Sequence, residues 1–106
     1  MIEVPIACHI EAIDPAERER HFELVTGWRD AIEKVEELPT GFAFRFPAQT
    51  AILMGLAEFI GRERLCCPFF HFEIVVEANG GSIWLRLMGG EDVKTFVQDN
   101  LLDSSP

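Results

Sequence analysis

Two alternating apolar segments on either side of an Asn-Gly dipeptide constrain the fold of this chain more than any other feature. Every second residue is apolar from 70 to 76 and again from 83 to 87, and Asn79-Gly80 lies between the two segments. Asn-Gly is a strong signal for a two-residue hairpin turn. That turn puts apolar partners on one face: Val76 opposite Ile83, Ile74 opposite Leu85, and Phe72 opposite Leu87.

A second pair of strands is predicted upstream of this hairpin. Phe42, Phe44 and Phe46 alternate with other residues, which places three aromatic rings on one strand face. Pro39-Thr40-Gly41 indicates a turn before that strand. The partner strand, near residues 32–38, is the weakest predicted element because neither register gives it an apolar face.

Three helices are predicted from apolar residues that recur at intervals of three and four. Asp14 caps the first helix and Pro15 fits its first position, whereas Pro68 must end the second. The buried stripes that we expect are, in chain order, Phe22, Val25, Trp28 and Ile32; Ile52, Leu56, Phe59 and Ile60; and Val93, Phe96, Val97 and Leu101.

Together these elements predict a single α+β domain over residues 1–106, with the order α-ββ-α-ββ-α. We expect a four-stranded antiparallel sheet with helices packed mainly on its Phe/Leu face. The two hairpin–helix units look alike, since an offset of 41 places Phe44 on Leu85 and Arg45 on Arg86. An internal duplication and shared apolar patterning both explain this likeness.

Composition narrows the classes of partner. The chain has 106 residues, 18 acidic and 9 basic, for a formal charge of −9, which argues against nucleic acid and anionic membranes. No apolar run is long enough to span a bilayer, and the N-terminus lacks the pattern of a signal peptide. Three cysteines, an odd number, do not form a secreted disulfide framework, so we expect a cytoplasmic protein.

The adjacent pair Cys66-Cys67 is the strongest candidate for chemistry. Vicinal thiols can bridge a soft ion such as Cu(I), Hg(II) or As(III), all of which prefer thiolate sulfur. Cys8 is a possible third ligand and His9 an accessory one, provided that the N-terminal segment reaches the end of the second helix. Zinc is disfavoured, because adjacent ligands strain a tetrahedral site and no Cys-x₂-Cys pair is present.

Other interpretations of these residues stay open. The cysteines can be structural, since Cys67 continues the buried stripe through Glu63, or they can serve redox chemistry. Glu63 is either an acid or base beside Cys67 or an ordinary paired carboxylate. His71 is an accessory candidate, although strand parity makes it a surface residue, and His21 is expected on a solvated helix face.

The outer face of the sheet is a candidate interface. Strand parity places Trp84, Met88 and Val75 there, and this set is more apolar than a solvent face requires. A homodimer contact or a small-ligand platform fits this composition. The other explanation is a half-exposed face partly covered by the first helix.

The block from Glu63 to Phe70, with Trp84 to Gly89, resembles a family of small uncharacterised bacterial proteins. Members share a Glu-Arg-x-Cys-Cys-Pro-Phe motif, an Ala-Cys pair as at Ala7-Cys8, and a Leu-Pro-x-Gly turn as at Leu38 to Gly41. The resemblance implies a bacterial cytosolic origin and favours a joint role for the three cysteines. It implies no substrate and no catalytic residue.

Three functional hypotheses follow. The first is a small cytosolic protein that binds a soft metal or thiophilic ligand through Cys66, Cys67 and Cys8, without a required cofactor. The second is a non-catalytic homodimeric module with buried structural cysteines. The third is a thiol redox protein or cysteine-dependent enzyme, which ranks last because the spacing shows no base beside a nucleophile.

Overall fold

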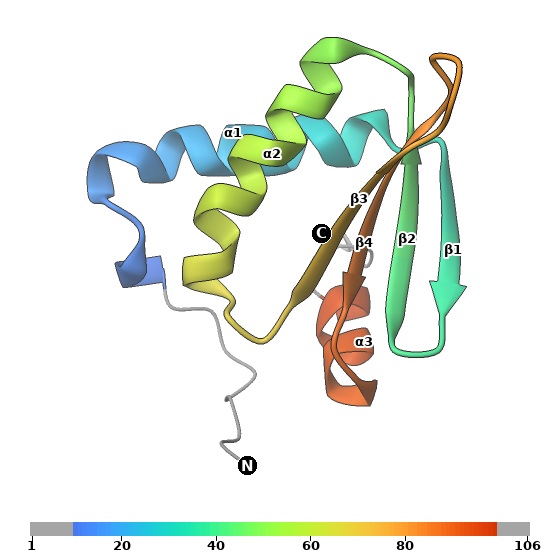
Figure 1. Ribbon diagram of the computed structural model, residues 1–106. Helices are drawn as coiled ribbons and strands as arrows, with labels where there is room; N and C mark the ends of the chain where they lie inside the picture. The colour runs from blue at the N-terminus through green and yellow to red at the C-terminus, as the bar shows by residue number, and fades with distance from the viewer. Residues whose placement is uncertain (1–9, 100–106) are drawn as a thin grey trace.

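The hairpin around Asn79-Gly80 is present in the computed structural model, which describes residues 10–99 (Figure 1). Strands β3 (His71–Val76) and β4 (Ile83–Met88) pair antiparallel in the predicted register, with Val76 opposite Ile83. Asn79 and Gly80 have φ values of 61° and 69°, which identifies a type I′ turn. The turn chemistry and the apolar pattern therefore specify the same register.

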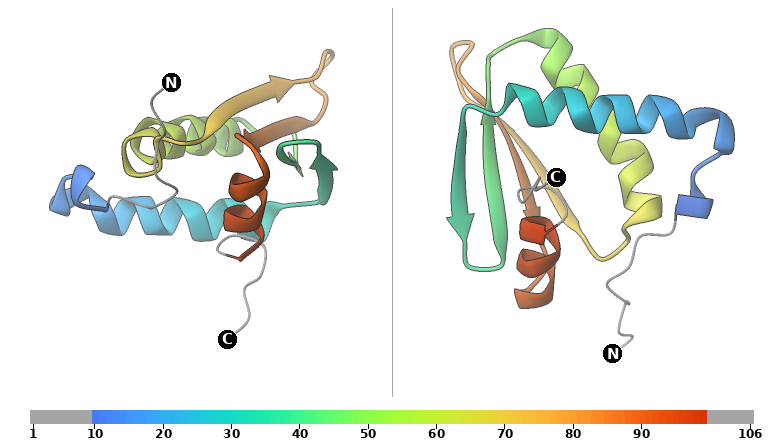
Figure 2. Two further views of the ribbon diagram at one scale, coloured as in Figure 1. Left: turned by 90° about the horizontal axis from the view of Figure 1, so that it is seen from below. Right: turned by 180° about the vertical axis from the view of Figure 1, so that it is seen from behind.

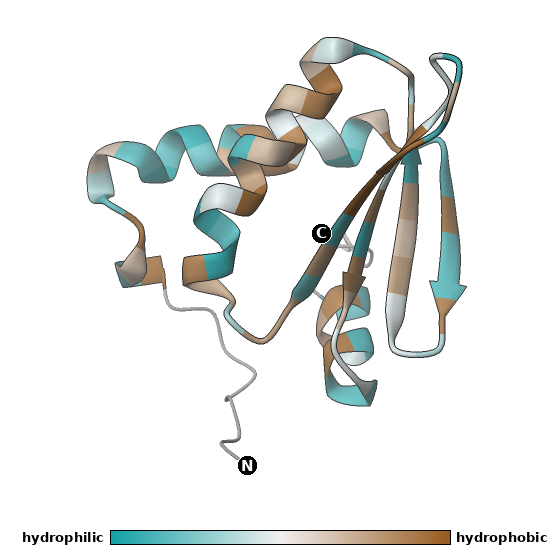
Figure 3. Ribbon diagram, viewed as in Figure 1, coloured by the Kyte–Doolittle hydropathy of each residue, from teal (hydrophilic) through white to brown (hydrophobic). Residues whose placement is uncertain are grey.

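The upstream strands complete the sheet. Strands β1 (Lys34–Leu38) and β2 (Gly41–Phe46) form a second antiparallel hairpin, and the strand order is β1-β2-β4-β3. Gly41 opposes Met88, and a Cβ atom at Gly41 would overlap the carbonyl oxygen of Leu87, so this position requires glycine. Strand β1 lies at the sheet edge and is mostly hydrophilic (Figure 3), which discourages pairing with another chain.

The predicted start of the first helix and the predicted end of the second are confirmed. Helix α1 (Pro15–Ala31) follows a short 3₁₀ turn, η1 (Ile10–Ala12), and the Asp14 carboxylate accepts a hydrogen bond from the Ala16 N–H at 3.0 Å. Helix α2 (Thr50–Cys66) stops two residues before Pro68, and α3 is Glu91–Val97. No helix in residues 10–99 is long and apolar enough to cross a membrane.

All three helices lie on the same side of the sheet (Figure 2), so the predicted α+β architecture is confirmed. Trp28 of α1 contacts the rings of Phe44, Phe46 and Phe59, which joins α1, α2 and the sheet in one core. The buried apolar residues are Ile13, Trp28, Phe42, Phe44, Phe46, Leu56, Phe59, Cys66, Cys67, Phe70, Ile83, Leu85, Leu87, Val93 and Val97.

Two predictions for α1 are wrong. Phe22, expected in the buried stripe, is 55% exposed, whereas His21, expected in solvent, is only 2% exposed. The rest of the predicted stripe is confirmed: Trp28 is buried, and Val25 and Ile32 pack against the core, so the stripe differs only in passing through His21 instead of Phe22. A buried imidazole is tolerated here because it stacks on Phe59 and faces a carboxylate of α2.

The expectation that the first helix partly covers the outer sheet face is also wrong, because α1 packs on the Phe/Leu face with Trp28 in the core (Figure 2). The stripe of α3 is confirmed at Val93 and Val97, which are buried, and Phe96 is half-buried. The expected burial of Leu101 lies outside the described residues.

Candidate functional site

The candidate site lies at the C-terminal end of α2, where the helix turns toward β3 (Figure 1). Pro68 prevents the helix from continuing, and Cys67 is the capping residue, its N–H donating to the Glu63 carbonyl at 2.6 Å. A separation of four residues on a helix places side chains on one face. Glu63 and Cys67 therefore point in the same direction, with Cys66 beside them.

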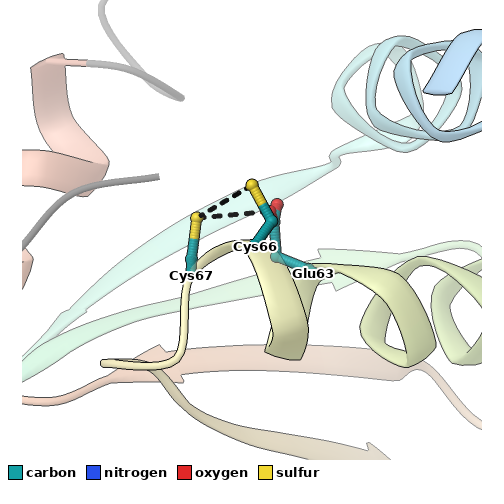
Figure 4. Close-up of side chains that lie close together, drawn as sticks. All are labelled: Glu63, Cys66 and Cys67. Atoms are coloured by element: carbon teal, nitrogen blue, oxygen red, sulfur yellow. Dashed lines mark hydrogen bonds between the residues drawn. The ribbon is translucent and has the colours of Figure 1, made fainter. Parts of the chain in front are cut away.

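The three side chains converge (Figure 4). The Sγ atoms of Cys66 and Cys67 are 3.9 Å apart, and Cys67 Sγ lies 3.3 Å from Oε1 of Glu63, to which it donates a hydrogen bond. The sulfur and carboxylate ligand atoms all lie within 4.8 Å of one another. This compact group contains two soft donor atoms and one hard one.

His21 of α1 is a fourth member of the group, and sequence reasoning missed it. Its Nε2 lies 3.6 Å from Oε1 of Glu63, and its ring stacks on Phe59 with a centroid distance of 5.5 Å. Within residues 10–99, His21 Nδ1 is buried without a hydrogen-bond partner. The two-turn spacing between His21 and Trp28 is the signal that could have revealed it.

The whole group is buried. Cys66, Cys67 and Glu63 are 4%, 1% and 7% exposed, and both cysteines belong to the hydrophobic core. The cysteines therefore fill core volume, as the structural interpretation predicts, and their sulfur atoms are also adjacent, as a shared ion requires. A buried carboxylate requires compensating partners, and those that the structure shows for Glu63 are the Cys67 thiol and the His21 imidazole.

The charged residues next to this group on α2 face elsewhere. Arg62 donates to Glu58 at 2.6 Å, and Glu58 also accepts two hydrogen bonds from Arg20 of α1. These bonds to Arg20 and Arg62 lower the pKa of the Glu58 carboxyl from 4.5 to about 2. This network joins α1 to α2 on the surface and does not belong to the cysteine group.

The predicted accessory ligand His71 does not belong to this group. His71 is exposed on the outer sheet face and lies 3.2 Å from Glu73. The pKa of the Glu73 carboxyl is lowered by its hydrogen bonds to His71 and Arg86. Cys8 and His9 lie outside the described residues.

The outer face of the sheet carries the predicted apolar set. Val75 and Trp84 are cross-strand partners, Met88 lies on the same face, and all three are half-buried. The indole N–H of Trp84 donates to Glu77 at 2.8 Å. A shallow hollow on this face is lined by Glu36, Leu38, Ala43, Val75, Glu77, Trp84 and Arg86.

Comparison of the chain with protein-family models, with curated proteins and with solved structures finds no match. The protein is therefore classified by its structure alone, as an α+β protein with a buried dithiol–carboxylate group. The likeness of the Cys-Cys-Pro-Phe block to a family of bacterial proteins stays a prediction.

Proposed function

We propose that this protein binds a thiophilic metal or metalloid ion in the bacterial cytosol, with Cys66 and Cys67 as its principal ligands. The observation that carries the proposal is the convergence of two sulfur atoms and one carboxylate oxygen within 4.8 Å. Thiolates select soft ions over the hard cations that carboxylates alone would bind. Burial of the group protects a bound ion from competing ligands in water.

The buried position has a kinetic consequence. Cys67 is 1% exposed, so an ion reaches it when the turn between α2 and β3 opens locally. That turn is short, and Phe69 and Phe70 on it pack against Phe96 of α3. Binding therefore couples the end of α2 to α3.

Titration of the reduced protein with Cu(I), Hg(II) or arsenite tests the proposal. We expect one ion per chain, and loss of tight binding in the Cys66→Ser/Cys67→Ser variant. Cys8→Ser is the matched control: retained binding shows that the vicinal pair is sufficient, and weakened binding identifies Cys8 as a third ligand. Equal, weak binding by the wild type and the double variant contradicts the proposal. Reducing conditions prevent Cys66 and Cys67 from forming a disulfide, which would compete with ion binding.

A second candidate function is a homodimeric interaction module. The observation in its favour is the outer sheet face, which no helix in residues 10–99 covers and which carries Trp84, Val75 and Met88. A half-buried tryptophan on an uncovered sheet is typical of contact surfaces. Sedimentation at tens of micromolar concentration should show a dimer that Trp84→Ser disrupts; a strict monomer rules this candidate out.

A further inference from the structure

The distance between the two sulfur atoms bears on the coordination geometry of a bound ion. With sulfur atoms about 2.3 Å from the ion, the two sulfurs are about 4.6 Å apart in linear coordination and about 4.0 Å apart at a planar angle of 120°. They are about 3.4 Å apart at angles of about 95°, as in a pyramidal three-coordinate ion such as arsenic(III). The sulfur atoms of Cys66 and Cys67 are 3.9 Å apart. A pyramidal ion therefore needs the sulfur atoms to approach by about 0.5 Å, and a two-coordinate linear ion needs them to separate by about 0.7 Å, so the pair is closer to bent, three-coordinate binding.

The third ligand position is already occupied by a suitable atom. Oε1 of Glu63 lies 3.3 Å from Cys67 Sγ and on the same side of the helix end as both sulfurs (Figure 4). Nε2 of His21 lies 3.6 Å from the same oxygen and restricts the movement of the carboxylate. Glu63 is thus positioned to complete a three-coordinate site.

Charge points to the oxidation state of the ion. Two thiolates and one carboxylate carry three negative charges. All three ligands are at least nine-tenths buried, and uncompensated charge is costly in such surroundings. A trivalent ion balances the charges of these three ligands, whereas Cu(I) leaves two negative charges on them and Hg(II) leaves one.

We infer that the site takes a trivalent, three-coordinate ion of the arsenic(III) type, with Cys66, Cys67 and Glu63 as its ligands. The inference rests on the soft-ion function proposed above. In the binding step, As(OH)₃ loses three As–O bonds and gains two As–S bonds and one As–O bond to Glu63. The two thiol protons leave with two hydroxides as water, and the third hydroxide leaves as water with a proton from solvent. Arsenic stays in the +3 state.

Two arsenic compounds separate the role of Glu63 from that of the thiols. Arsenite keeps a third position that Glu63 can fill, whereas in phenylarsine oxide a phenyl group already holds it. We expect Glu63→Gln to weaken arsenite binding by about 10- to 100-fold, the usual loss when a metal site loses a supporting group, and to leave phenylarsine oxide binding nearly unchanged. Glu58→Gln, on the same helix but outside the site, is the matched control and should change neither.

The possible outcomes are distinct. Failure of the wild type to bind either compound overturns the proposed function itself. Binding of both compounds with equal losses in Glu63→Gln overturns only the assignment of Glu63 as a ligand.

Should Glu63→Gln not fold, X-ray absorption of the wild-type arsenite complex decides. Two sulfur neighbours and one oxygen support the inference, but an oxygen from solvent would give the same shell, so carboxylate ligation must also appear as an arsenite-induced shift of the Glu63 carboxylate infrared band. Three sulfur neighbours, or no such shift, overturn it.

Discussion

Arg62 precedes Glu63 in the chain, but its ion pairs are with Glu17 and Glu58. The Glu63 carboxylate instead faces two thiols and an imidazole in the core. Its Oε1 atom lies within 3.6 Å of both Cys67 Sγ and His21 Nε2. The adjacency of the cysteines and the spacing from Glu63 to Cys67 are visible in the sequence, so this part of the site could be predicted. His21 could not, because its partner lies on another helix and its burial depends on how α1 is rotated against α2.

The pairing of His21 with Glu63 predicts a stability effect. His21→Ala should lower the free energy of unfolding by about 2 to 4 kcal/mol, because it leaves a cavity beside Phe59 and removes the imidazole from the buried Glu63 carboxylate. Urea unfolding measures this. His71→Ala, an exposed histidine that also faces a glutamate, is the control and should change stability by about 0.5 kcal/mol or less. Equal effects of the two substitutions contradict the structural role given to His21.

Two glycines, one in a helix and one in a strand, differ in the space around them. In α2, a Cβ atom at Gly61 meets nothing within 4 Å, whereas at Gly41 it overlaps the Leu87 carbonyl of the neighbouring strand. Turns and helix ends are marked by local residue types, which is why the start of α1, the end of α2 and the β3–β4 hairpin follow from the sequence. The close approach of β2 to β4 at Gly41 is a contact between distant segments, and no local pattern reports it.

These two glycines predict changes of opposite sign. Gly61→Ala should stabilise the protein by about 0.5 to 1 kcal/mol, since alanine restricts the unfolded chain and favours helix. Gly41→Ala should destabilise it by about 1 to 3 kcal/mol, because two strands must move apart. Thermal unfolding of both variants checks this, and a stabilising Gly41→Ala would contradict the β2–β4 pairing.

The ionic link between α1 and α2 predicts a dependence on pH. The pKa of Glu58 is lowered from 4.5 to about 2 by hydrogen bonds to Arg20 and Arg62, so the folded state holds the carboxylate ionised. Its stabilising contribution is complete above pH 4.5 and is lost as the pH falls toward 2. The stability difference between wild type and Glu58→Gln should therefore shrink over that window and at high salt. A difference that stays constant from pH 7 to pH 2 contradicts this role.

At the scale of the whole molecule, the sequence predicts the sheet and its covering helices better than it predicts which strands and helices are neighbours. Alternation and helical spacing suffice for a four-stranded sheet with one covered face, since every element must bury its apolar side. The order β1-β2-β4-β3 depends on which hairpin edges meet, as in the pairing of Phe44 with Leu85. The rotation of α1 likewise depends on Trp28 packing among three phenylalanines.

The claim that Cys66 and Cys67 hold one ion together is tested most directly by native mass spectrometry with phenylarsine oxide. A stable adduct of this compound needs two neighbouring thiols, because it forms two As–S bonds and releases one water. The account predicts one arsenical per reduced wild-type chain and none on Cys66→Ser/Cys67→Ser, which still contains Cys8. The same adduct on both proteins, or no adduct on the wild type, would contradict it.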